Sequence, residues 1–183
     1  MWFFNLFKKK KNEISHEQIS KNCLSTISSH ISDKIDKVNW ANFQTAYGNA
    51  EKTIPFYLKN LFCSDEKIAM DASHQLWCSL CHQHVFISDA AVPSYEILKI
   101  ALSELNDELK IEILDIFTGF AYCSRPDYDY IIDIGMDKWK WELRQKMLED
   151  IELYKDLSKN TNEDIAAFAI RICENLVNQE IND

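Results

Sequence analysis

Two short motifs of one form, an apolar residue followed by proline, any residue and tyrosine, constrain this chain more than any other feature. Ile54-Pro55-Phe56-Tyr57 and Val92-Pro93-Ser94-Tyr95 lie 38 residues apart, and an apolar run with helical spacing follows each. A period of about 40 residues is typical of proteins built from repeated helix pairs. The spacing therefore predicts an all-α fold in which antiparallel helix pairs stack side by side and leave an extended surface for a large partner.

The scarcity of turn-forming residues supports the helical prediction. Only three of the 183 residues are glycine and three are proline, whereas 46% are apolar. Few turns favour long helices over a β-sandwich, and no apolar run is long enough to span a bilayer. We expect a single helical domain over residues 15–183 without a sheet, preceded by a separate aromatic and lysine-rich segment over residues 1–14.

Apolar residues recur every three or four positions along most of the chain, which is the spacing of a buried helical face. The expected helices cover residues 15–36, 40–47, 55–63, 137–157 and 161–180. A further helix capped by Ser64-Asp65 contains residues 68–81, another follows Pro93, and a third contains residues 109–122. A shift of 41 residues superimposes two of them. It aligns the apolar faces Ile68, Ala72, Leu76 and Leu80 with Leu109, Ile113, Phe117 and Ala121.

The same shift aligns polar residues on the other side of these two helices, Asp71 with Glu112 and His74 with Asp115. In stacked helical repeats the second helix of each pair usually lines the concave surface, so we expect this polar ridge to meet a ligand. A loop that alternates acidic residues with tyrosine follows the second of these helices. The predicted partner-binding residues are Asp71, Glu112, Asp115, Asp127, Tyr128, Asp129 and Tyr130.

The charge of the chain excludes one class of partner. The net charge is −9, and it becomes −13 when the lysine run Lys8–Lys11 is left out. An acidic body repels phosphate backbones, so we expect no nucleic-acid partner. The apolar stretch Met1–Phe7 precedes its charges and is too short for an export signal. It either packs on the first helix or acts as a weak membrane-surface anchor without stable insertion.

The six cysteines indicate the cellular compartment in which we expect the protein. They lie on apolar helical positions without a secretory segment, so we expect buried free thiols and a cytoplasmic protein. The run Cys78-Ser79-Leu80-Cys81-His82 has the form of a haem-attachment motif, and His74 and His84 lie near it. Haem attachment requires export, and a zinc site requires a second ligand pair that the spacing does not provide. We therefore expect no metal and no cofactor.

Two further patterns permit chemistry but have simpler explanations. Glu112 and Asp115 lie on adjacent turns and could act as acid and base. A solvated helix face explains them equally well, since no nucleophile is paired with them. The cluster Trp139-Lys140-Trp141 mixes aromatic and basic residues as nucleic-acid grooves do, but it fits a core position and its flank. We expect no enzymatic activity.

The segment from Trp40 to Pro93 resembles a family of bacterial HEAT-like repeat proteins. In that family an aromatic residue precedes Tyr-Gly-x-Ala and an apolar-proline pair, and the second helix ends in His-Gln before small residues and another apolar-proline pair. This chain has Trp40, Tyr47-Gly48-Asn49-Ala50, Ile54-Pro55, His82-Gln83 and Ala90-Ala91-Val92-Pro93 in that order. It departs after Gln83, where it has His84 and the family usually has glycine. The resemblance implies a short HEAT or armadillo-like stack that acts as a scaffold.

Small acidic helical proteins of this kind are often immunity partners of bacterial contact-dependent or polymorphic toxins. The resemblance thus leads to the hypothesis that the chain binds and neutralises a basic toxin domain, such as a nuclease, by presenting carboxylates where substrate phosphates bind. A general helical-repeat adaptor is the alternative. An enzyme similar to the helical-repeat DNA glycosylases is a third possibility, but those enzymes carry a basic concave face and this chain is acidic.

Overall fold

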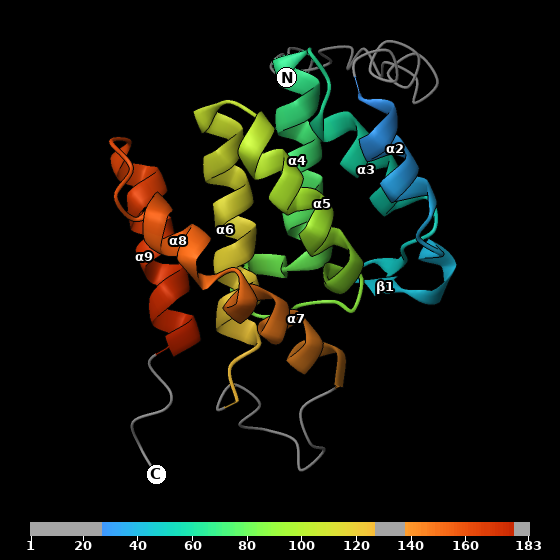
Figure 1. Ribbon diagram of the computed structural model, residues 1–183. Coiled ribbons are helices and arrows are strands. Elements are labelled where there is room, and N and C mark those ends of the chain that lie inside the picture. Colours follow the sequence, from blue (N-terminus) through green and yellow to red (C-terminus); the bar gives the residue numbers. More distant parts are fainter. Residues whose placement is uncertain (1–26, 127–137, 178–183) are drawn as a thin grey trace, which may run out of the picture.

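The computed structural model describes residues 27–126 and 138–177 (Figure 1). Most of these residues are helical, as the sequence predicts. The α-helices are α2 (Ser29–Asp36), α3 (Thr53–Leu61), α4 (Glu66–Leu80), α5 (Ala91–Glu104), α6 (Asp107–Cys123), α7 (Lys138–Glu149), α8 (Ile151–Leu157) and α9 (Glu163–Val177). The shorter elements are the 3-10 helices η1 (Trp40–Asn42) and η2 (His82–His84) and the strands β1 (Gln44–Thr45) and β2 (Gly48–Asn49).

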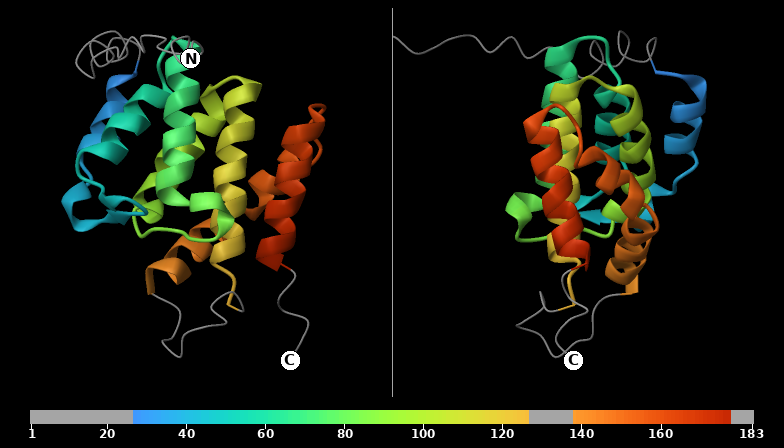
Figure 2. Two further views of the ribbon diagram at one scale, coloured as in Figure 1. Left: turned by 180° about the vertical axis from the view of Figure 1, so that it is seen from behind. Right: turned by 60° about the vertical axis from the view of Figure 1, so that its left-hand side comes forward.

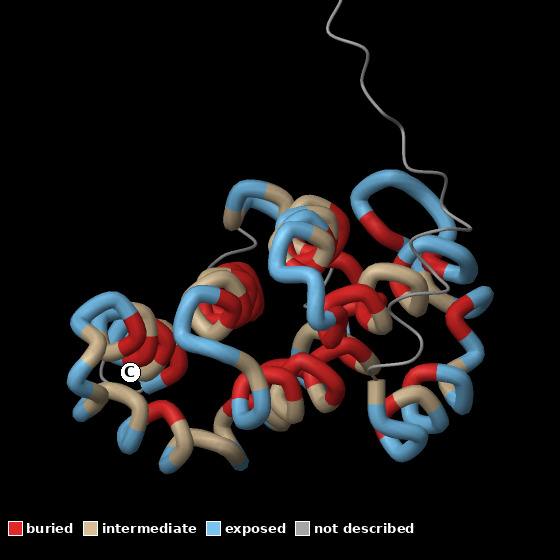
Figure 3. Tube along the Cα trace, turned by 90° about the horizontal axis from the view of Figure 1, so that it is seen from above, coloured by how far each residue is buried: buried red, intermediate tan, exposed pale blue. Residues whose placement is uncertain are grey.

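The helices form two layers. Helices α4, α6 and α9 lie side by side in one layer, which faces the viewer in Figure 2, left, and α3, α5, α7 and α8 lie behind it. Short turns join α3 to α4, α5 to α6 and α8 to α9, so each of these pairs crosses from one layer to the other. Seen from above, the buried residues gather between the layers (Figure 3). Helices α4 and α6 therefore run parallel, because each is the second member of its pair.

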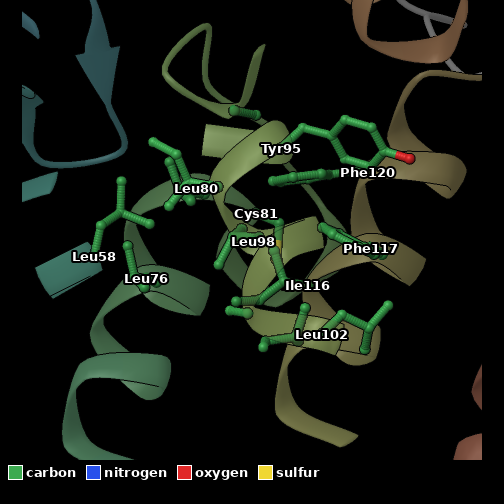
Figure 4. Packing of buried hydrophobic residues seen from close by; sticks show 14 of the residues in the cluster. Leu58, Leu76, Leu80, Cys81, Tyr95, Leu98, Leu102, Ile116, Phe117 and Phe120 are labelled. Carbon is green, nitrogen blue, oxygen red and sulfur yellow. The ribbon is translucent and has the colours of Figure 1, made fainter. Parts of the chain in front are cut away.

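The core lies between the layers, where apolar side chains of α4, α5 and α6 meet. Leu76, Leu98 and Phe117 are fully buried and point towards one another across three helices (Figure 4). Burying one such side chain contributes roughly 1.5–3 kcal/mol. The apolar faces predicted for the two aligned helices are confirmed, except that Ile68 is only partly buried. None of the described helices has the length and apolar content needed to cross a membrane.

The two proline motifs occupy the same place in the fold. Pro55 is the third residue of α3 and Pro93 the third residue of α5, where proline leaves no helical hydrogen bond unmade. The helices that follow begin at side-chain caps. The Asp65 carboxylate accepts from the backbone N–H groups of the first turn of α4, and the Asn106 side-chain oxygen accepts from Leu109 N–H at the start of α6.

Two predicted helix boundaries are wrong. The helix expected over residues 15–36 does not run unbroken, because Ser28 has an extended backbone and its hydroxyl caps a new helix that begins at Ser29. The helix expected over residues 137–157 divides at Asp150 into α7 and α8. The Asp150 carboxylate accepts from the Tyr95 hydroxyl at 2.9 Å and the Lys99 ammonium at 2.6 Å, so contacts with α5 fix the point where the chain turns.

The helix expected over residues 40–47 is wrong as well, and so is the expectation that the fold has no sheet. The chain forms η1 and then a hairpin in which Gln44 pairs with Asn49. The hairpin joins distant segments: Ala46 N–H donates to the Ser79 carbonyl at 3.0 Å, and Gln44 N–H donates to the Asp89 carboxylate at 2.6 Å. Gly48 has φ +117°, a conformation that glycine adopts without strain.

One basic side chain is buried in the fold. Arg144 of α7 donates to the carbonyls of Asn175 at 3.1 Å and Leu176 at 2.8 Å, in the last turn of α9. It also reaches the Ala121 carbonyl near the end of α6 at 3.5 Å. Carbonyls of a last helical turn have no partner within their own helix. Arg144 satisfies them and so ties α7 to the ends of both neighbours.

Candidate functional site

The surface formed by the outer sides of α4 and α6 carries three of the seven side chains predicted for the site, namely Asp71, Glu112 and Asp115. The two helices lie side by side in Figure 2, left, with η2 at their C-terminal ends. His74 of α4 interacts electrostatically with Glu112 of α6, and His84 of η2 contacts Asp115. We call His74, His84, Glu112 and Asp115 the α4–α6 ridge. Asp71 also lies exposed on α4, but it acts on Tyr57 of α3 and so stands at the border of the ridge.

The remaining predicted site residues, Asp127, Tyr128, Asp129 and Tyr130, lie outside the described part of the chain. The expectation that the aligned helices share a polar surface is therefore testable only for residues on α4 and α6. These two helices do place their polar faces on one side of the molecule. His84 joins them, and the sequence alignment did not include it.

His84 anchors η2 to α6. Its imidazole Nε2 lies 3.2 Å from the Asp115 carboxylate and 3.0 Å from the Asp115 carbonyl oxygen. The hydrogen bond to the Asp115 carboxylate raises the pKa of His84, although its burial and the nearby charge of Arg171 act in the opposite direction. A protonated His84 therefore forms an ion pair with Asp115 and neutralises it in part.

The backbone at η2 adopts an unusual conformation. Gln83 and His84 have φ angles of 52° and 55°, in the left-handed region that residues other than glycine rarely occupy. Glycine would adopt this conformation at position 84 without strain. Gly119 of α6 lies directly beneath, and a Cβ there would come within 2.8 Å of the His84 ring and 3.0 Å of Cys81 Cβ. The absence of a side chain at Gly119 lets η2 lie against α6.

Carboxylates accumulate along the same surface. Burial, and then the charge of Asp115, raises the pKa of Glu112, while His74 lowers it. At the other end of the two helices a hydrogen bond to Glu108 raises the pKa of Glu66. Glu112 has no ion pair or hydrogen bond among the residues that the structure describes, and it is partly buried. The surface thus holds neighbouring negative charges that a cation from outside would stabilise.

The two cysteines of the haem-like motif lie in different surroundings. Cys78 Sγ lies 3.7 Å from His74 Nε2 on the same helix, whereas Cys81 is buried against α6. Burial raises the pKa of the Cys78 thiol, which reduces the thiolate fraction that a nucleophile or metal ligand needs. Within residues 27–126 and 138–177 no three His, Cys, Asp or Glu side chains converge as metal ligands do.

The expectation that all cysteines are free thiols is wrong for Cys63. Cys63 is disulfide-bonded, whereas Cys78, Cys81, Cys123 and Cys173 are free. Spacing along the chain could not reveal this pairing, because a disulfide depends on the distance between Cα atoms in the folded protein.

Sequence reasoning also missed an exposed apolar group beside the ridge. Val85 and Phe86, which follow η2, are 66% and 48% exposed, and Tyr47 of the hairpin turn is 67% exposed. The Tyr47 hydroxyl lies 3.2 Å from His82 Nδ1, which links the hairpin to η2. The consecutive apolar residues after His84 were the available signal, but a pair of residues has no periodicity from which to predict exposure.

An open groove lies on another side of the molecule. Ile100, Leu102, Leu153 and Leu157 line an open groove of about 420 Å³ between α5, α6 and α8. Lys99 and Lys110 also line it, but Lys99 pairs with Asp150 at 2.6 Å and Lys110 with Asp107 at 3.6 Å. Because both ammonium groups already have carboxylate partners, this groove presents fewer unpaired charges than the ridge.

No family model, curated protein or solved structure matches this chain. The likeness to bacterial HEAT-like repeat proteins therefore rests on the residues quoted for it.

Proposed function

We propose that this protein is a non-catalytic binding module that holds a basic protein through the α4–α6 ridge. The observation that carries the proposal is Glu112, a half-buried carboxylate beside Asp115 without an ion-pair partner in the described structure. A lysine or arginine from a partner would relieve the repulsion between these two groups. In this proposal the pairs α3/α4, α5/α6 and α8/α9 are HEAT-like repeats, and the ridge belongs to their second helices.

Among binding modules, an immunity protein for a toxin domain is the class that we favour. A nuclease toxin binds phosphates through a basic site, and the carboxylates of Glu112 and Asp115 match such a site in charge. A general adaptor would use the same surface with a different partner. An enzyme similar to DNA glycosylases is disfavoured, because the ridge would repel the phosphates of its substrate.

The test is association with the product of a neighbouring toxin gene, measured at two salt concentrations. Glu112→Lys should slow association on the order of tenfold at low salt and reduce its salt dependence. Glu112 is a better choice than Asp115, because Asp115 also holds His84 and its reversal would disturb η2. Glu142→Lys on α7 is the matched control, since it makes the same change in net charge on an exposed site in the other layer.

Equal slowing by both variants would mean that overall charge and not the ridge steers association, and it would contradict the proposed site. Survival of cells that express the toxin together with this protein tests the narrower hypothesis. If the wild-type protein binds the toxin but does not protect the cells, the adaptor function replaces immunity.

A further inference from the structure

The loop between α4 and α5 is closed at its base and projects from the helical body. Ser88 N–H donates to the Leu80 carbonyl at 3.0 Å, and the Ser88 hydroxyl donates to the Ser79 carbonyl at 3.3 Å. The buried side chain of Ile87 anchors the last part of the loop in the core. Residues 82–86 therefore extend beyond α4 and α6, as η2 does in Figure 2, right.

Helix α6 holds this loop in an unfavourable backbone conformation. Two consecutive non-glycine residues in the left-handed region persist only where surrounding contacts fix them, and such residues concentrate at functional sites. Here the contacts come from Asp115, which binds the His84 ring, and from Cys123, whose thiol donates to the His84 carbonyl at 3.3 Å. The loop is thus held in place through both the side chain and the backbone carbonyl of His84.

The fixed loop exposes apolar side chains next to acidic ones. Phe86 is 48% exposed and Val85 66%, and Tyr47 lies alongside through its contact with His82. Exposed apolar groups with a polar rim are typical of protein-binding sites, and preorganised aromatic side chains often provide most of the binding energy. Asp115 fixes the loop through His84 and is also one of the two carboxylates of the α4–α6 ridge. The exposed apolar side chains therefore lie next to the acidic part of the ridge.

We propose that Val85 and Phe86 form the apolar anchor of the partner-binding surface, and that the partner is a basic polypeptide with apolar side chains beside its cations. This inference rests on the proposed function, because the charge of the ridge selects the basic partner. The same charge disfavours an anionic lipid surface as the occupant. A second copy of this chain is disfavoured for the same reason, since it would bring two acidic ridges together.

Two synthetic peptides of equal positive charge test the anchor on the full-length protein. In one, lysine alternates with leucine, and in the other, lysine alternates with serine. Wild-type protein should bind the leucine peptide about tenfold more tightly at low salt, because Phe86 and Val85 bury its side chains. Phe86→Ser should remove most of that difference and leave the affinity for the serine peptide unchanged.

Trp141→Ser is the matched control, since Trp141 of α7 is 44% exposed but lies in the other layer. The anchor hypothesis is contradicted if both variants lose the same affinity for the leucine peptide. It is also contradicted if Phe86→Ser loses none. Glu112→Lys should instead weaken the binding of both peptides equally. If it does not, the proposed function is contradicted, whereas the apolar anchor is not. Self-association of the wild-type protein that Phe86→Ser abolishes, measured by sedimentation, would assign the patch to a second copy and overturn the proposal.

Discussion

Gly119→Ala should destabilise the protein although alanine is the better helix former. Inside a helix alanine is favoured over glycine by about 1 kcal/mol. Against this, the added methyl group would lie 2.8 Å from the His84 ring, 3.0 Å from Cys81 Cβ and 3.1 Å from Cys81 Sγ. Real Cβ atoms essentially never approach other atoms within 3.0 Å, so the His84 ring or Gly119 itself would have to shift.

The surrounding groups have little freedom to move. The His84 ring is bound to both the carboxylate and the carbonyl of Asp115, and Cys81 is buried. Overpacking of this kind costs about 1–3 kcal/mol, and displacing a half-exposed His84 from Asp115 adds about 1 kcal/mol. After subtraction of the helical gain, the free energy of unfolding should fall by about 1–3 kcal/mol.

Urea unfolding followed by circular dichroism measures this change. The variant His84→Gly provides a second test, because it removes the ring that the new methyl group meets and suits the left-handed backbone. In that background Gly119→Ala should cost at least about 1 kcal/mol less, which a double-mutant cycle would show. If Gly119→Ala alone stabilises the protein by about 1 kcal/mol, η2 does not lie against Gly119 of α6.

Two further predictions concern pH and the buried cation. Since the folded pKa of His84 is raised, its pair with Asp115 should contribute fully to stability below pH ~6.5. That contribution should disappear as the pH rises through the raised pKa, and Asp115→Asn should flatten this part of a plot of melting temperature against pH. Arg144→Met should lower the free energy of unfolding by about 2–4 kcal/mol, because carbonyls at the ends of α6 and α9 lose their donor. A change below about 0.5 kcal/mol in urea unfolding would contradict that role.

Local signals predicted the helices and most of their buried faces. The motif prolines both stand in the first turn of a helix, and α4 begins where the side chain of Asp65 caps it. Caps and apolar periodicity act within one or two turns, so a single stretch of sequence contains all of their information. The same periodicity aligned α4 with α6, which lie side by side in the structure.

The candidate site was predictable in part. Glu112 and Asp115 share one partly buried face of α6, as their spacing requires, and His74 reaches the same surface from α4. Asp71, which the alignment paired with Glu112, lies exposed on α4 and also acts electrostatically on Tyr57 of α3. An alignment of two helices predicts which faces correspond, but the rotation of each helix against its neighbours depends on packing.

The sequence by itself determined the all-helical class, the main helices and the acidic character of the surface. Tertiary structure decided the remainder: the hairpin at Gln44, the burial of Arg144, the disulfide at Cys63 and the left-handed turn at His84. The hairpin, the burial of Arg144 and the turn at His84 depend on groups that are distant in sequence, as when Gln44 bonds Asp89 or His84 bonds Asp115. Such contacts form only when the helices bring the groups together, so no local pattern of residues encodes them.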